Sequence, residues 1–135
     1  MNKILIVDDV PKNIQMAMNM LKDEGYHMFY AKDAKMALKL VKEHNFDLIL
    51  QDIMMPEVDG FEVCKILKSD RQTADISIIF LSGRDSNQDI QRAYEVGGVD
   101  YIIKPFIDIE LKTKVAIHSE LARLRKKFKA TRSTE

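Results

Sequence analysis

A chain of 135 residues, with 46% hydrophobic and 31% charged residues, has the composition of one globular domain rather than of a disordered or fibrous protein. Its single cysteine, Cys64, excludes an internal disulfide and a cysteine-based zinc site, and we expect it to lie in the core. No apolar run approaches the roughly 18 residues of a membrane span, and no secretory signal pattern is present. We therefore expect a cytoplasmic protein that does not enter a membrane.

The formal net charge is zero, but it is unevenly distributed. Residues 120–135 contain six basic and two acidic residues, a net charge of +4, so residues 1–119 carry −4. An acidic body does not favour nucleic acid, and we expect no direct nucleic-acid binding. The basic end could contact any anionic surface.

Five short apolar runs have the character of strands that are buried in a sheet. They lie at residues 3–7, 26–31, 48–50, 76–81 and 101–103. Each run is followed by apolar residues at helical spacing. The first of these helices has Pro11 in its first turn, and the second has Asp33 as its N-cap.

The third predicted helix spans residues 61–68, and the fourth carries Ile90, Ala93 and Tyr94 on one face. The fifth begins near Asp108. Strands that alternate with helices in this way predict an α/β fold, with a parallel sheet covered by helices on both faces.

Charged and hydroxyl side chains follow four of the five strands. They are Asp8 and Asp9, Asp52, Ser82, and Lys104. The carboxyl ends of parallel strands meet at one edge of the sheet, so we expect these groups to converge there. Clustered carboxylates repel one another unless a cation intervenes, and Mg²⁺ suits an all-oxygen site that receives phosphate. Asp52 would be the nucleophile that forms an aspartyl-phosphate, with Lys104 neutralising the phosphoryl group.

Four motifs together carry a resemblance to a known family. They are Ile-Val-Asp-Asp (6–9), Asp-Ile-Met-Met-Pro-Glu-Val-Asp-Gly (52–60), Leu-Ser-Gly (81–83) and Gly-Gly-Val-Asp-Tyr-Ile-Ile-Lys-Pro-Phe (97–106). In this order and spacing, the chain resembles the receiver domain of two-component response regulators over residues 2–121. The resemblance implies a doubly wound, flavodoxin-like fold with five parallel strands in the order 2-1-3-4-5 and five helices.

The resemblance also implies roles for the residues at the sheet edge. Asp52 would accept a phosphoryl group from a sensor histidine kinase or a phosphotransfer protein. Asp8 and Asp9 would hold Mg²⁺ together with Asp52 and the backbone carbonyl of Met54. Lys104 would contact the phosphoryl oxygens.

Two further residues would carry the response to phosphorylation, and a third, Pro105, would have a structural role. Ser82 would contact the phosphoryl group and draw its loop inward, and Tyr101 would change rotamer as that loop moves. The surface formed by the fourth helix, the fifth strand and the fifth helix would then change and control a partner or an output domain. Pro105 would follow a cis Lys-Pro bond. Taken alone, Asp52 could simply cap the following loop, and Tyr101 could be a core aromatic.

We expect a phosphorelay switch that catalyses only its own phosphorylation and slow dephosphorylation, and not a turnover enzyme. A phosphatase of the haloacid dehalogenase type requires an acid two residues after the nucleophile, where this chain has Met54. A nucleotide-binding domain would have a glycine-rich fingerprint after the first strand, and this sequence has none there. A DNA-binding regulator would require a helix-turn-helix after Leu121, and we find no such pattern in these residues.

The sequence of the last helix is consistent with two different arrangements of its C-terminal part. We assign residues 1–121 to the receiver domain and residues 122–135 to a basic helical extension that ends in a disordered segment from Ala130. Apolar residues spaced by 4, 3 and 4 give a short coiled-coil pattern at Ile117, Leu121, Leu124 and Phe128. The helix could pack on the sheet and then fray, or it could be a connector that pairs with a second copy as a homodimer or leads to an output domain.

Overall fold

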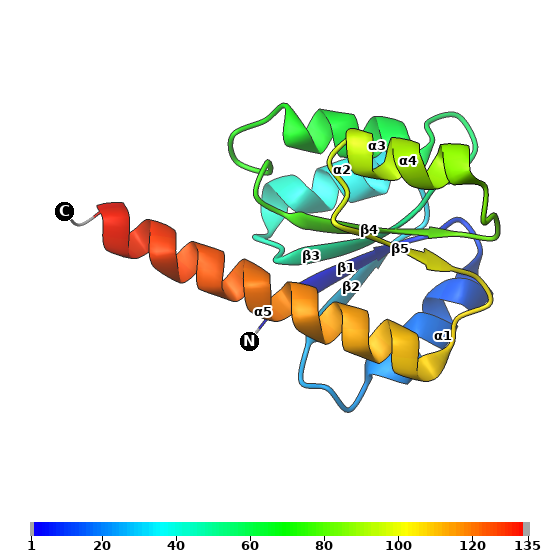
Figure 1. Ribbon diagram of the computed structural model, residues 1–135, viewed down its shortest axis with the longest axis horizontal. Coiled ribbons are helices and arrows are strands. Elements are labelled where there is room, and N and C mark those ends of the chain that lie inside the picture. Colours follow the sequence, from blue (N-terminus) through cyan, green and yellow to red (C-terminus); the bar gives the residue numbers. More distant parts are fainter. Residues whose placement is uncertain (1, 134–135) are drawn as a thin grey trace.

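The computed structural model describes residues 2–133, and the side chains of residues 2–129. Five strands and five helices alternate along the chain, as the sequence predicts (Figure 1). The strands are β1 Lys3–Val7, β2 His27–Ala31, β3 Leu48–Asp52, β4 Ser77–Ser82 and β5 Asp100–Ile103. The helices are α1 Pro11–Leu21, α2 Ala34–Glu43, α3 Gly60–Lys68, α4 Asn87–Glu95 and α5 Asp108–Ser133.

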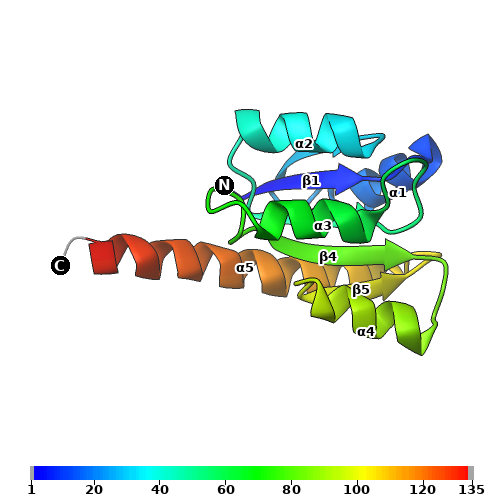
Figure 2. The ribbon, with the colours of Figure 1, turned by 90° about the horizontal axis from the view of Figure 1, so that it is seen from above.

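The strands form one parallel sheet in the order β2-β1-β3-β4-β5, which confirms the predicted fold. Successive side chains along each strand enter two separate cores. Leu5 and Ile49 pack in the core beneath α2, α3 and α4, whereas Ile4 and Leu50 pack in the core beneath α1 and α5. Figures 1 and 2 show these two helical layers on opposite faces of the sheet. Burial on both faces explains why the strands are nearly continuous apolar runs.

Short polar side chains define where several helices begin. Asp33 accepts a hydrogen bond from the backbone N–H of Met36 at 2.7 Å, which confirms it as the N-cap of α2. Asp59 caps α3 in the same way through the N–H of Glu62, at 2.9 Å. The first helix has Pro11 at its first position, where the missing N–H needs no partner.

A few boundaries and orientations differ from the sequence prediction. β4 begins at Ser77 and includes Ser82, so it lies one residue further along than the apolar run. Ala93 is buried, but Tyr94, predicted on the same helical face, is largely exposed. Cys64 is fully buried, as predicted. Among residues 2–133, no helix is both long and apolar enough to cross a membrane.

The last helix is longer than predicted and projects beyond the sheet (Figure 2). Residues 130–133 are helical, although their polarity predicted disorder from Ala130; Thr134 and Glu135 lie outside the described residues. No glycine or proline follows Pro105, so nothing in the sequence interrupts the helix.

Polar contacts tie this helix to the edge of the sheet where the strands begin. Arg125 donates to the Ser77 hydroxyl at the start of β4, over 2.8 Å. Lys126 pairs with Asp47 just before β3, at 2.6 Å. Lys129 pairs with Asp75. The extension therefore lies in a defined orientation against the domain.

Candidate functional site

The carboxyl ends of β3, β4 and β5 bring three predicted site residues to one edge of the sheet. Asp52 and Ser82 are the last residues of β3 and β4, and Lys104 directly follows β5. Backbone pairing continues one residue past the strands, with hydrogen bonds from Ile53 N to Leu81 O at 3.1 Å and from Lys104 N to Ser82 O at 2.7 Å. The sheet itself therefore fixes the relative positions of these residues.

Three carboxylates converge at this edge. Asp8, Asp9 and Asp52 each offer an oxygen, and these oxygens all lie within 4.8 Å of one another. Asp8 and Asp52 are buried, while Asp9 is partly exposed and keeps one side of the group accessible. A compact set of hard oxygen donors with an accessible side fits Mg²⁺, which binds through a few carboxylates and retains water ligands. These acids therefore form a suitable site for the predicted ion.

Lys104 joins two of the carboxylates. Its Nζ donates to Asp8 Oδ2 at 2.8 Å and to Asp52 Oδ1 at 2.9 Å. Burial disfavours the charge on Lys104, but the hydrogen bonds to the two acids outweigh this effect and raise its pKa above the ordinary lysine value. The ammonium group therefore stays charged and partly neutralises the acidic cluster.

The environment of Asp52 also shifts its acid–base behaviour. Burial raises its pKa from the ordinary 3.8 to about 6, and the negative charges of Asp8 and Asp9 act in the same direction. The hydrogen bond from Lys104 opposes this rise. At neutral pH the carboxylate is still mostly ionised, which a nucleophile requires, and it is more basic than an exposed aspartate.

The loop after β3 folds back over the backbone of Asp52. Gly60 N donates to Ile53 O at 2.8 Å, and a Cβ atom placed on Gly60 would lie 2.2 Å from the carbonyl oxygen of Asp52. Only glycine allows this close approach. The side chain of Met54, in the same loop, is 54% exposed and, being a thioether, adds no carboxylate to the site. Its backbone carbonyl remains a predicted metal ligand.

Ser82 and Tyr101 lie at the end of β4 and in β5, and both contact the same loop. Ser82 Oγ accepts a hydrogen bond from Arg84 N at 3.1 Å. The Tyr101 hydroxyl donates to the Arg84 carbonyl at 2.9 Å, and its ring is buried. Among the described hydrogen bonds, none joins Ser82 to the carboxylates. The Lys104–Pro105 peptide bond is cis.

One contributor to the site is absent from the sequence prediction. Gln51 is fully buried in β3, and its side-chain amide donates to the backbone oxygen of Asp52 at 2.9 Å. The amide thus supports the backbone of the predicted nucleophile from the opposite face of the sheet. A polar residue between the apolar run and Asp52 was the signal that could have indicated it.

Comparison with known proteins identifies this arrangement. The sequence model of the family described as "Response regulator receiver domain" matches residues 4–116. The chain is 40% identical over 115 residues to a Vibrio cholerae protein named "Probable cyclic di-GMP phosphodiesterase", covering 85% of this chain and 26% of that protein. It is 38% identical over 115 residues to the transcriptional regulatory protein CpxR of Escherichia coli K12, covering 85% and 48%. The chain thus spans about a quarter to a half of these relatives.

Solved structures agree with the sequence comparison. The chemotaxis response regulator CheY4 of Vibrio cholerae superimposes with a TM-score of 0.82 and 31% identity, covering 87% of this chain and 98% of that one. NtrX from Brucella abortus superimposes with a TM-score of 0.86 and 26% identity, covering 96% and 30%. The family match over most of the chain and the shared fold lead to one conclusion: this chain belongs to the response regulator receiver domain family.

Proposed function

We propose that the chain is a phosphorylation-operated switch in which Asp52 accepts the phosphoryl group. The observation that carries this proposal is the position of Lys104, whose Nζ lies within 2.9 Å of carboxylate oxygens of both Asp8 and Asp52. A buried, basic carboxylate beside a cation and two further acids is arranged to receive a phosphoryl group, because such transfer depends mainly on positioning and charge neutralisation.

In the proposed reaction, an oxygen of ionised Asp52 attacks the phosphorus atom of a phosphohistidine on a kinase or phosphotransfer protein. The new O–P bond forms as the P–N bond breaks, and the imidazole leaves with the electron pair of the P–N bond. Lys104 would move its hydrogen bond from Asp52 to a phosphoryl oxygen. Asp8, Asp9, Asp52 and the Met54 carbonyl would hold Mg²⁺, which would supply further positive charge toward the phosphoryl oxygens.

Ser82 and Tyr101 would convert the modification into a change of surface. Both form hydrogen bonds with the backbone of Arg84, in the loop that follows β4: Ser82 with its amide and Tyr101 with its carbonyl. A phosphoryl group that recruits the Ser82 hydroxyl would release the Arg84 amide, and we propose that the loop and Tyr101 then move together. The surface of α4, β5 and α5 would change as a result.

The proposed phosphodonor is a sensor histidine kinase or a phosphotransfer protein, and the proposed target is a partner protein or an output domain. Residues 1–121 would form the receiver unit and residues 122–135 its basic extension, with a homodimer among the possible assemblies. Relatives named as transcriptional regulators support a cytoplasmic location, because transcription occurs in that compartment in bacteria. With a methionine at position 54, the chain lacks the second acid that a phosphatase of the haloacid dehalogenase type requires, and we propose that this domain catalyses only its own phosphorylation and slow dephosphorylation.

Intact-mass measurement after incubation with acetyl phosphate tests the proposal. We expect a gain of one phosphoryl group that requires Mg²⁺ and that the Asp52→Asn variant loses. Asp59→Asn is the matched control, since Asp59 only caps α3 and asparagine caps a helix equally well. No mass gain in the wild type, or an equal gain in Asp52→Asn, would contradict the assignment of the phosphoacceptor.

A further inference from the structure

We propose that the outer side of α2, together with a hollow between α2, α3 and the loop after β3, binds an acidic peptide segment of a partner protein. Lysines along α2 would pair with acids of this segment, and the hollow would receive one of its apolar side chains. The proposal does not depend on phosphoryl transfer at Asp52.

Four lysines form one cationic stripe along α2. Lys35, Lys39 and Lys42 are exposed and lie four and three positions apart, so their side chains project from one side of the helix. Lys32 lies three residues before Lys35, next to the N-cap Asp33. In the part of the chain that the structure describes, no ion pair joins any of these four lysines to an acid. The stripe is therefore available to carboxylates of another molecule.

A hollow borders the stripe on the side of α3. Its volume is about 580 Å³, which is within the range of protein sites that bind small ligands. Leu38, Val58 and Ile66 supply apolar walls from α2, from the loop after β3 and from α3. Lys32 and Lys35 also line the hollow, so its apolar surface and the lysine stripe are continuous.

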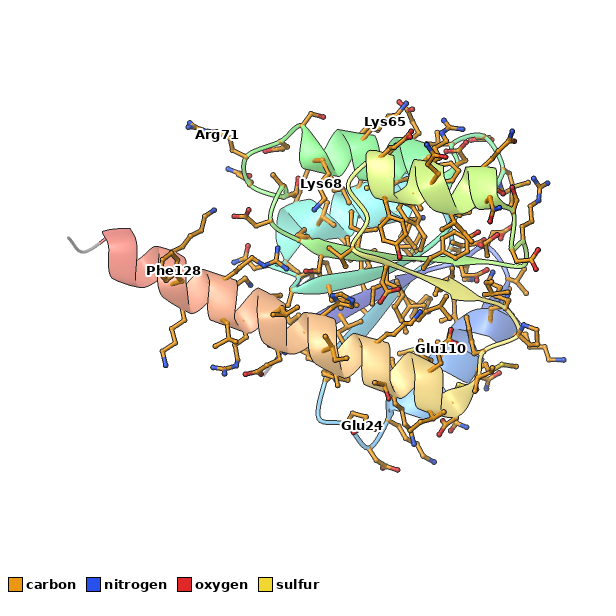
Figure 3. The ribbon with its side chains drawn as sticks, viewed as in Figure 1. Glu24, Lys65, Lys68, Arg71, Glu110 and Phe128 are labelled. Carbon is orange, nitrogen blue, oxygen red and sulfur yellow. The ribbon has the colours of Figure 1, made fainter. Side chains whose placement is uncertain are left out.

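This surface extends over two adjacent helices. Figure 2 shows α2 and α3 side by side, and both pack into the same core on one face of the sheet. Figure 3 shows Lys65 on the outer side of α3, where it is exposed and next to Ile66 in the chain. Along α2, the distance from Lys35 to Lys42 is about 10 Å, or about two turns of helix. A short peptide segment can therefore contact the lysines and the hollow at the same time.

Acids in the hollow favour a peptide over other anionic partners. Asp9 and Glu57 line the hollow together with the two lysines. Glu57 has a backbone φ of 69°, which glycine adopts at lower cost, so the loop carries this carboxylate despite some strain. A membrane surface or a nucleic-acid backbone is negative throughout, and these acids would repel it. A peptide can place acids opposite the lysines and a neutral or basic residue opposite Asp9 and Glu57.

Selection from a random library of displayed peptides, with the full chain as the target, tests the kind of partner. We expect the enriched peptides to be acidic and to contain a large apolar residue. Lys35→Glu/Lys39→Glu should bind them at least about tenfold more weakly than the wild type, because like charges would then face each other. Lys12→Glu/Lys22→Glu is the matched control, since it makes the same change of charge at two exposed lysines of the α1 region.

Fluorescence anisotropy of a labelled, enriched peptide measures these affinities. Ile66→Asp should also weaken binding, because it places a charge in the apolar wall of the hollow; Ile66 is 42% exposed, so the fold should tolerate the change. Raising the ionic strength should weaken binding by the wild type, since salt screens exposed charges. Equal melting temperatures of the variants would exclude misfolding as the cause.

Enriched peptides without an excess of acids would overturn the proposal, as would equal binding by Lys35→Glu/Lys39→Glu and the wild type. Vesicles of phosphatidylglycerol and phosphatidylcholine, and a DNA duplex, are tested under the same conditions. Tighter binding of either through the same lysines would overturn the choice of a peptide. Asp52→Asn separates this proposal from the proposed function, because that variant should lose phosphorylation and keep peptide binding.

Discussion

Replacing Asp52 by asparagine should stabilise the metal-free protein while abolishing its phosphorylation. Burial raises the pKa of Asp52 from 3.8 to about 6, so ionisation of this carboxyl in the folded state is unfavourable. Since each pKa unit corresponds to about 1.4 kcal/mol, ionised Asp52 lowers the free energy of unfolding by up to about 3 kcal/mol at neutral pH. Asparagine has nearly the same shape and no charge, and we expect a gain of about 1–3 kcal/mol.

The gain should depend on pH in a defined direction. Between pH 4 and 6 the folded state binds the Asp52 proton more tightly than the unfolded state does, so stability falls as pH rises through this window. Above pH 6 the full loss of stability caused by Asp52 is present. Below pH 4 the carboxyl is protonated in the folded and the unfolded state, so it causes no loss. The difference between Asp52→Asn and the wild type should therefore be largest at neutral pH and small near pH 4.

Urea denaturation of both proteins in EDTA, at several pH values, measures this difference. Asp59→Asn provides the control for loss of a carboxylate outside the site. Adding Mg²⁺ should stabilise the wild type more than Asp52→Asn, since a ligand that binds only the folded state adds to its stability. A variant that is less stable than the wild type at neutral pH, or a difference that does not change with pH, would refute the reasoning.

Three further substitutions and one control substitution probe the same framework. Lys104→Met should lower the free energy of unfolding at neutral pH by about 2 kcal/mol and slow phosphorylation by acetyl phosphate, because Asp8 and Asp52 lose their shared cation; unchanged values of both would contradict the bridging role. Gly60→Ala should cost about 1–3 kcal/mol in urea denaturation through its clash with the Asp52 carbonyl. Gly83→Ala, which meets no atom within 4 Å, should cost less. Asp100→Asn should cost about 1 kcal/mol at neutral pH: burial opposes the charge of Asp100, but hydrogen bonds from its partners, mainly on α5, lower its pKa overall. This loss should disappear as the pH falls through the pKa of the folded protein, and a loss that persists in acid would exclude the electrostatic explanation.

The features that the sequence predicted well are those in which a local pattern has one physical solution. A strand buried on both faces requires an apolar run such as residues 48–50, and a polar residue that ends such a run must lie at the sheet edge. This logic places Asp8, Asp52 and Lys104 together from the sequence alone, and in the structure Lys104 donates hydrogen bonds to both acids.

The features that the sequence did not predict depend on contacts between distant segments. The bond from Gln51 to the backbone of Asp52 leaves no periodic pattern, because a single polar residue in a strand is equally consistent with several roles. The helical state of residues 130–133 was missed because polarity alone favoured disorder. Contacts from Lys126 to Asp47 and from Arg125 to Ser77 support the preceding turns, and their partners are far away in sequence.

Because α5 is an uninterrupted helix, it sets both the distance and the orientation of any protein fused after it. Each residue of an α-helix advances about 1.5 Å and turns about 100°. Because Lys126 and Arg125 fix the rotation of this helix relative to the sheet, the direction in which an attached protein faces is set by the number of residues between them. Inserting two residues would turn the attachment to nearly the opposite side, whereas inserting seven would restore its direction to within about 20°. Fusions made at successive positions along α5 should therefore differ in orientation with helical periodicity rather than in proportion to linker length.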